Sequence, residues 1–285
     1  MAVNKEKAPA PARPLRLAVD IGNTNTVIGL FAGTEIRRRW RLATRKDTTV
    51  DEIAWWLYGL IRSEEDRGLV GAIGMASVVP GLDDIWARGL EGAFGIVPEI
   101  LDYTHCLGLK LAYDIPGQIG ADRLANVLGA HALGYKEGVV IDLGTATTFD
   151  VFADYTYWGG IICPGIQSSM RSLAQSASKL SEVELRWPAG AIGKTTDDAL
   201  RIGILLGTVG QVEYLLGNVF AEKGMRSPSV IATGGLAPLL HGRSPAFRTI
   251  EPDLTLIGIN HMLAGGPRRA AKASAPAGEK KGKRK

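Results

Sequence analysis

The 285 residues are 46% hydrophobic and 22% charged, a balance typical of a globular protein with one large or two medium domains. We find no run of about 18 apolar residues and therefore expect no membrane span. Residues 266–285 contribute +7 to the net charge of +4, which leaves −3 for the rest of the chain. A mildly acidic body gives no support to nucleic-acid binding.

The two cysteines and four histidines have no metal-ligand spacing, so we expect no zinc site and a cytoplasmic location. Residues 1–14 lack the apolar segment of a secretory signal and are predicted to be a flexible leader. Residues 266–285 are predicted to be a disordered basic tail. The tail is either a solubilising extension or an arm that binds anions weakly.

The pattern of apolar residues predicts an alternation of strands and helices. Apolar runs at 15–21 and 26–32, separated by Gly-Asn-Thr-Asn, predict a β-hairpin. Residues 51–62 have helical spacing, and Thr49 with Glu52 forms a capping box. Further segments are expected in this order: a strand over 69–79, a helix over 121–133, a strand over 139–143, helices over 166–180 and 197–220, and a strand over 229–232 that leads through Gly234 and Gly235 into a short helix. The fold class is therefore α/β with antiparallel hairpins.

An internal repeat organises the chain. The segment 17–26 is echoed by 139–148, at an offset of 122 residues. Each copy has an apolar strand, an Asp-x-Gly turn rich in hydroxyl groups, and a second apolar strand. Two copies of one hairpin predict two similar subdomains, over 15–135 and 136–265, that face each other across a cleft.

The two Asp-x-Gly turns have the composition of phosphate sites. An aspartate at the end of a buried strand is costly unless a cation compensates it. The glycine that follows lets the backbone turn tightly and present its N–H groups. Donors for phosphate oxygens beside a carboxylate for Mg²⁺ are what phosphoryl transfer requires. One such turn is more often an ordinary hairpin, but the pair indicates nucleotide phosphate binding.

A third carboxylate, Asp122, lies in the segment Gly120-Ala121-Asp122-Arg123, which opens the predicted helix. Its apolar face leaves Asp122 and Arg123 at the N-terminus, where we expect both to point out of the core. Asp122 could accept a proton from an attacking hydroxyl. Arg123 could hold a substrate carboxylate with two hydrogen bonds. The alternative is a helix cap followed by a surface charge.

The order of these motifs resembles the duplicated, ribonuclease H-like fold of the acetate and sugar kinase/Hsp70/actin superfamily. In that fold a Gly-Gly turn on a later strand meets the adenosine, and Thr233-Gly234-Gly235-Leu236 is similar to it. The resemblance implies two actin-like subdomains around a nucleotide cleft.

Several strings are similar to those of one family, the type III pantothenate kinases. They are Asp20-Ile21-Gly22-Asn23-Thr24, Tyr113-Asp114-Ile115-Pro116, Gly120-Ala121-Asp122-Arg123, the run over 157–165, and Gly193-Lys194-Thr195-Thr196. The resemblance implies phosphorylation of pantothenate by ATP with Mg²⁺, the first step of coenzyme A synthesis. It also implies a homodimer with the active site near the interface.

The same resemblance assigns roles to individual residues. Asp122 matches the proton acceptor, and Asp142 matches a ligand of a monovalent cation, K⁺ or NH₄⁺. Asp20 is expected to hold Mg²⁺, directly or through water. The ATP-binding residues are expected to be Asp20, Ile21, Gly22, Asn23, Thr24, Asn25, Thr26, Val27 and Thr145. The substrate-binding residues are expected to be Tyr113, Gly120, Ala121, Asp122, Arg123 and Thr196.

Three other functions stay open from the sequence. The scaffold could serve a kinase or phosphatase for another small molecule. It could belong to a regulatory relative that binds nucleotide without transferring phosphate. The basic tail could be a nucleic-acid arm.

Overall fold

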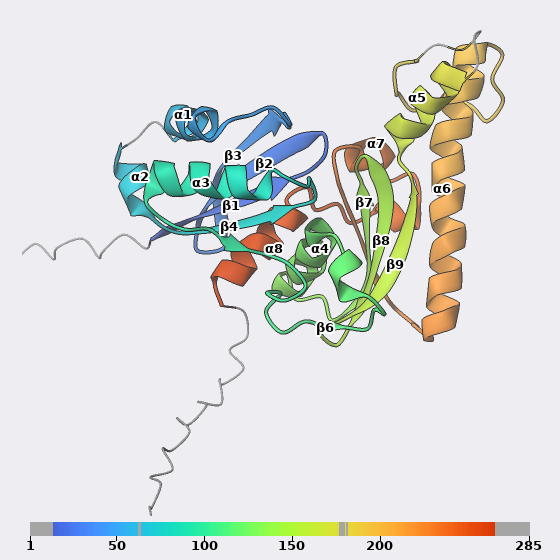
Figure 1. Cartoon of the computed structure of the whole chain (residues 1–285). Coiled ribbons are helices and arrows are strands. Elements are labelled where there is room, and N and C mark those ends of the chain that lie inside the picture. The colour runs from blue at the N-terminus through green and yellow to red at the C-terminus, as the bar shows by residue number, and fades with distance from the viewer. Residues whose placement is uncertain (1–13, 62–63, 177–179, 181, 266–285) are drawn as a thin grey trace, which may run out of the picture.

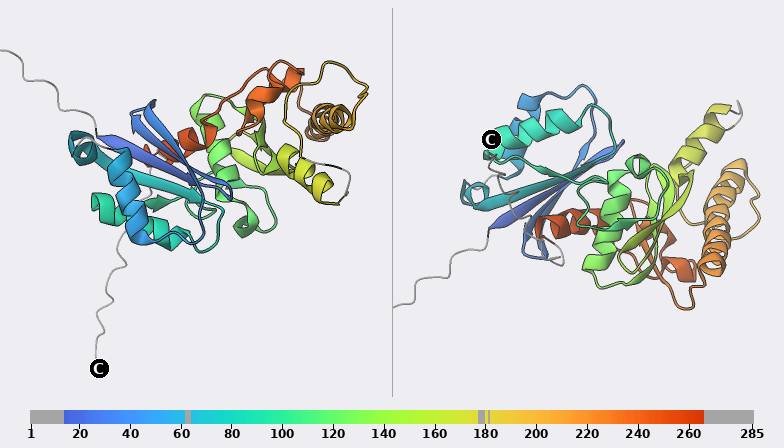
Figure 2. Two further views of the ribbon diagram at one scale, coloured as in Figure 1. Left: turned by 90° about the horizontal axis from the view of Figure 1, so that it is seen from above. Right: turned by 60° about the horizontal axis from the view of Figure 1, so that its bottom comes forward.

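The computed structural model describes residues 14–61, 64–176, 180 and 182–265 (Figure 1). The predicted tail and, apart from Pro14, the predicted leader lie outside these residues. Two five-stranded sheets lie side by side, with helices between them and on their outer faces (Figures 1 and 2). This is the α/β architecture that the sequence predicts.

The first sheet has the strand order β3-β2-β1-β4-β5. Its strands are β1 (Leu15–Ile21), β2 (Asn25–Ala32), β3 (Glu35–Ala43), β4 (Val70–Ser77) and β5 (Glu99–Ile100). The second sheet has the order β10-β7-β8-β9-β6. Its strands are β6 (Lys110–Leu111), β7 (Glu137–Leu143), β8 (Ala146–Ala153), β9 (Thr156–Pro164) and β10 (Ser229–Thr233).

The two sheets repeat one topology. Strand β1 pairs antiparallel with β2 and parallel with β4, and β7 pairs antiparallel with β8 and parallel with β10. Strands β3 and β9 extend the two hairpins in the same way. The internal repeat therefore extends over four strands of each sheet, while β5 and β6 join non-equivalent edges. The division of the chain at residue 135 stays a prediction, because β6 and the last helix each join the opposite half.

Two helices fill the space between the sheets (Figure 2). Helix α4 (Ala121–Ala132) and helix α8 (Leu254–Leu263) cross at glycines. A Cβ atom on Gly258 would lie 1.8 Å from the Ala125 carbonyl oxygen, and one on Gly129 would lie 2.3 Å from the Leu254 carbonyl oxygen. The two backbones therefore pack in direct contact, which fixes the start of α4 relative to both sheets.

The remaining helices cover the outer faces. They are α1 (Val50–Leu60), α2 (Glu64–Leu69), α3 (Asp83–Phe94), α5 (Ile166–Ser176), α6 (Thr196–Lys223) and α7 (Ala237–Leu240). Helix α1 begins with the predicted capping box of Thr49 and Glu52. The sequence reading omitted β3, β9, α3 and α8, together with the short elements α2, β5 and β6. Strand β3 contains four arginines, Arg37, Arg38, Arg39 and Arg41, so it lacks an apolar run of the kind that indicated β1 and β2.

Helix α6 is long and apolar enough to cross a membrane by length and composition alone, although the sequence reading found no such run. Its residues Ile204, Leu205, Val212 and Leu216 are buried in the apolar cluster of the second sheet. Charged residues lie along the same helix. We therefore interpret α6 as an amphipathic helix of the folded domain.

Candidate active site

The two Asp-x-Gly turns meet at the junction of the sheets. The hydroxyl oxygens of Thr24 and Thr145, one from each turn, lie 3.0 Å apart. Gly22 N donates to the Asn25 carbonyl at 3.0 Å, and Gly144 N donates to the Ala146 carbonyl at 3.0 Å. The structure thus brings together two tight turns that lie 121 residues apart in the chain.

The second turn is shorter than the first. Strand β1 ends at Ile21 and β2 begins at Asn25, whereas β7 ends at Leu143 and β8 begins at Ala146. The offset of the repeat therefore falls from 122 residues before the turn to 121 after it. This shift places Thr24 opposite Thr145. An alignment of the two segments without a gap pairs Thr24 with Ala146 instead.

Three carboxylates gather beneath these turns. Asp20 and Asp142 each occupy the last position but one of the first strand of a hairpin, β1 or β7, and Asp122 lies in the first turn of α4. Burial raises the pKa of Asp20 well above its usual value, and the carboxylates of Asp122 and Asp142 raise it further. Burial, followed by the Asp122 carboxylate, raises the pKa of Asp142 to about 6. The folded chain therefore compensates the charged forms of Asp20 and Asp142 only in part, although Arg41 opposes the rise of the Asp20 pKa.

A buried amide links this group to the helices. Asn126 Nδ2 donates to Asp142 Oδ2 at 3.2 Å, and Asn126 Oδ1 accepts from the Thr255 hydroxyl of α8 at 2.8 Å. Asn126 follows Asp122 by four residues, so both side chains lie on one face of α4. The sequence reading missed Asn126, although this spacing was a usable signal.

The Gly-Gly turn after β10 reaches the same place. Thr233, the last residue of β10, pairs with Asp142 of β7. A Cβ atom on Gly234 would lie 2.4 Å from Asp142 Oδ1, and Gly234 has a φ of +89° that other residues rarely adopt. The backbone of this turn therefore packs directly on the Asp142 carboxylate.

The Asp122 carboxylate accepts a hydrogen bond from the backbone of the next residue and packs closely against Gly120. Its Oδ1 accepts from Arg123 N at 2.7 Å, and a Cβ atom on Gly120 would lie 2.6 Å from that oxygen. Burial raises the pKa of Asp122, while the Arg123 N–H opposes the rise. A carboxylate with a raised pKa in a polar site is suited to accept a proton.

Arg123 does not point out of the core, contrary to our expectation. It is buried, its Nε donates to Asp150 Oδ1 at 2.7 Å, and its Nη2 donates to the Phe149 carbonyl at 2.9 Å. Tyr157 donates its hydroxyl to the same Asp150 oxygen at 3.2 Å. The sequence reading missed Asp150 because the partner lies 27 residues away on β8. Binding of substrate by Arg123 stays a prediction.

Tyr113 lies beside this buried ion pair. Its ring centroid is 6.1 Å from that of Tyr157, whose ring in turn lies 5.9 Å from the Arg123 guanidinium carbon. Thr196 lies elsewhere: it is the first residue of α6, which runs on the side of the second sheet away from the first sheet (Figure 1). The structure therefore brings Tyr113 toward Arg123 but does not bring Thr196 to the three carboxylates.

The predicted ATP-binding run from Asp20 to Val27 divides into exposed and buried residues. Asn23 and Thr24 are exposed at the tip of the turn, and Gly22 and Asn25 are partly exposed beside them. Ile21 and Thr26 are fully buried, and Val27 packs on the core, so these three support the turn. Thr44, which the sequence reading missed, braces the turn, since its hydroxyl donates to the Gly22 carbonyl at 2.7 Å.

Across the described residues, no set of three or more acidic, histidine or cysteine side chains is arranged to hold a metal ion. The three carboxylates therefore do not form a closed metal cage. Mg²⁺ commonly uses one or two carboxylates together with water and substrate phosphates. The partly compensated charge of Asp20 and Asp142 fits a cation that arrives with such a substrate.

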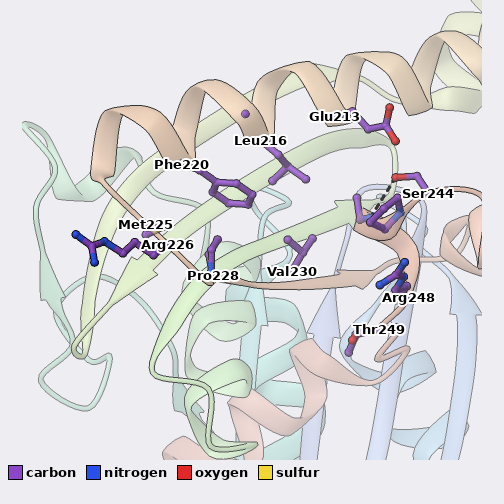
Figure 3. A pocket seen from close by; sticks show the side chains of 13 residues that line it. Glu213, Leu216, Phe220, Met225, Arg226, Pro228, Val230, Ser244, Arg248 and Thr249 are labelled. Atoms are coloured by element: carbon purple, nitrogen blue, oxygen red, sulfur yellow. Dashed lines mark hydrogen bonds between the residues drawn. The ribbon is translucent and has the colours of Figure 1, made fainter.

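A pocket of about 570 Å³ lies away from this site, between α6, β10 and the segment 244–249 (Figure 3). Leu216, Phe220 and Val230 make its floor apolar, and Arg226 and Arg248 lie among its lining residues. None of the predicted site residues lines it. We locate the chemistry at the three carboxylates, because phosphoryl transfer depends on converging charged groups and N–H donors.

The chain is similar to known proteins over most of its length. Residues 16–218 match a family model described as type III pantothenate kinase. A type III pantothenate kinase from Desulfosudis oleivorans is 41% identical over 246 residues, which cover 85% of this chain and 96% of the relative. One from Rhizorhabdus wittichii is 42% identical over 265 residues, which cover 88% and 99%.

Solved structures share the fold at low identity. A protein described as a Baf family transcriptional activator from Campylobacter jejuni has a TM-score of 0.57 at 19% identity, covering 87% of this chain and 97% of that one. A ROK hexokinase from Thermus thermophilus has a TM-score of 0.50 at 14% identity, covering 87% and 98%. Together with the repeated sheets, these likenesses confirm the predicted duplicated actin-like fold.

Proposed function

The chain belongs to the type III pantothenate kinase family and phosphorylates pantothenate with ATP, and we propose that Asp122 and the two Asp-x-Gly turns perform this reaction. The reaction yields 4′-phosphopantothenate in the first step of coenzyme A biosynthesis. The observation that supports this site best is the meeting of the Thr24 and Thr145 hydroxyls above three carboxylates. We also propose that the enzyme works in the cytoplasm.

The phosphates of ATP are proposed to lie against Gly22–Thr24 and Gly144–Thr145. Backbone N–H groups and threonine hydroxyls in these turns can donate to phosphate oxygens. The Gly234–Gly235 turn, which packs on Asp142, is proposed to meet the adenosine, as the resemblance to the superfamily implies. Mg²⁺ bound with ATP would neutralise phosphate charge, and Asp20 would hold it directly or through water.

Asp122 is proposed to orient and deprotonate the 4′-hydroxyl of pantothenate for attack on the γ-phosphorus. As the oxygen–phosphorus bond forms, the bond to the leaving ADP breaks, and the hydroxyl proton passes to the Asp122 carboxylate. Tyr113 and the run from Gly120 to Arg123 would hold the rest of the substrate. The buried pair of Arg123 and Asp150 fixes this part of α4.

Asp142 is proposed to help bind a monovalent cation, K⁺ or NH₄⁺, next to the phosphates. Asp142→Asn should therefore remove the stimulation of activity by these cations, because the neutral amide offers less charge to a cation. Rates measured over a series of K⁺, NH₄⁺ and Na⁺ concentrations test this. Asp83→Asn on the outer helix α3 is the control and should keep the wild-type response. Unchanged cation stimulation in Asp142→Asn would remove that residue from the cation site.

We propose that the enzyme is a homodimer and that α6 forms part of the interface. Only 28% of the most apolar window of α6 is buried within the chain, and Tyr214 on it is 73% exposed. An uncovered apolar surface of this kind favours association. A partner copy is also the route by which Thr196, distant from the carboxylates of its own chain, could reach a substrate.

Tyr214→Glu should shift the protein from dimer to monomer, because it places a charge in the apolar interface. Light scattering coupled to size-exclusion chromatography measures the mass directly. Tyr58→Glu, a half-exposed tyrosine on α1, is the matched control and should leave the mass unchanged. A Tyr214→Glu protein that keeps the dimer mass would place the interface elsewhere.

A coupled assay of ADP release, with and without pantothenate, tests the function itself. ADP release that requires pantothenate is the expected result, and other small alcohols should not replace it. ADP release that depends on another substrate, or nucleotide binding without transfer, would contradict the proposed roles of these residues.

A further inference from the structure

We propose that Arg41 binds the phosphate chain of the nucleotide. Arg41 lies on β3 of the first sheet, and its side chain reaches the second half of the molecule. The inference rests on the proposed location of ATP at the two Asp-x-Gly turns. No motif singled out Arg41, since the strand that carries it was not found in the sequence.

The register of the first sheet places Arg41 in one row with Asp20. Asp20 is opposite Val27 of β2, and Val27 is opposite Arg41 of β3. Residues directly opposite each other in paired strands project from the same face of a sheet. Val27 packs on the apolar cluster that includes α4 and α8 residues, so this row faces the second half of the molecule.

The Arg41 side chain reaches that second half. A Cβ atom on Gly235, in the turn after β10, would lie 3.5 Å from Arg41 Nη1. The guanidinium of Arg41, a residue of the first sheet, therefore lies next to the Gly-Gly turn that follows β10 of the second sheet. The proposed path of the nucleotide, from the adenosine end at this turn to the phosphates at Asp20, passes the same point.

Among the described residues, the donors of Arg41 are not used by another side chain or carbonyl. Within the part of the chain that the structure describes, the Arg41 side chain makes no hydrogen bond or ion pair, and the residue is exposed. It is also the cation that opposes the raised pKa of Asp20. A planar guanidinium with free donors is suited to bind phosphate oxygens with two hydrogen bonds.

The neighbouring arginines of β3 differ in this respect. Arg39 forms an ion pair with Asp253 before α8, and Arg37 lies 3.9 Å from Glu35 on the exposed edge. Both therefore have structural partners, whereas Arg41 is presented at the junction of the sheets. Arg37→Gln consequently serves as a matched control on the same strand.

The test measures nucleotide affinity in three variants. Arg41→Gln should weaken binding of ATP and ADP about tenfold to a hundredfold, because it removes a charge-assisted hydrogen bond to phosphate. Its affinity for adenosine and its KM for pantothenate should stay at wild-type values. Arg41→Lys should recover part of the loss, and Arg37→Gln should bind ATP like the wild type. Thermal unfolding checks that each variant is folded.

Two further measurements separate the possible failures. ADP affinity measured in EDTA without divalent metal should also fall in Arg41→Gln, and an unchanged affinity would overturn the inference. Thr145→Val reports on the proposed site. Weaker ATP binding in Thr145→Val but not in Arg41→Gln would refute Arg41 alone. Normal binding in both variants would refute the location of the nucleotide.

Discussion

Asp122→Asn should lower kcat by about a hundredfold or more, within the range of general base catalysis. The amide keeps the shape of the side chain and can still accept from Arg123 N, but it cannot take the proton of the attacking hydroxyl. The KM for ATP should change little, since the turns that would hold the phosphates are intact. Steady-state rates at saturating ATP and pantothenate measure the effect.

The matched control is Asp84→Asn, an exposed aspartate on α3 that pairs with Arg88. It should retain wild-type turnover. Thermal unfolding of Asp122→Asn should occur at or above the wild-type temperature, because loss of a carboxylate from a group of three like charges relieves repulsion. Turnover near the wild-type rate in Asp122→Asn would show that another group takes the proton.

The second large effect is expected at the buried pair of Arg123 and Asp150. Asp150 is fully buried, and Asp150→Ala would leave the Arg123 guanidinium without its partner. Removal of one member of a buried ion pair costs about 3–5 kcal/mol of the free energy of unfolding. Urea denaturation should therefore show a much lower midpoint for Asp150→Ala than for the wild type.

Replacing both members tests the reason for that loss. The double variant Arg123→Met with Asp150→Leu leaves no unpaired charge and should be more stable than Asp150→Ala. It should nevertheless have a raised KM for pantothenate if Arg123 contacts the substrate. If Asp150→Ala is as stable as the wild type, the Arg123 guanidinium must form other contacts in that variant.

Local patterns in the sequence predict most of the elements that carry the site. Strands β1 and β2 follow from apolar runs around a turn, and α1 follows from helical spacing with a capping box. The repeat of Asp20 and Asp142 predicts that two turns meet, and the hydrogen bond of Thr24 with Thr145 agrees with it. These features depend on residues that are close in the chain or repeated in it.

Other features depend on contacts that no local pattern contains. The predicted orientation of Arg123 was wrong because Arg123 lies on α4 and its partner, Asp150, lies on β8. Asp150 is flanked by apolar residues of that strand, so the sequence pattern does not reveal it. The spacing of Asn126 from Asp122 could have indicated this residue, but its hydrogen bonds with Asp142 of the second sheet and Thr255 of α8 could not be predicted from a local pattern. The distance of Thr196 from the carboxylates follows from the course of α6, which helical periodicity does not fix.

The convergence of the two turns and three carboxylates on one nucleotide is the central claim. A crystal structure with a non-hydrolysable ATP analogue and pantothenate tests it most directly. The account predicts the phosphates between Gly22–Thr24 and Gly144–Thr145, with the pantothenate 4′-hydroxyl at Asp122. Nucleotide bound instead in the pocket between α6 and β10, with the turns empty, would contradict it.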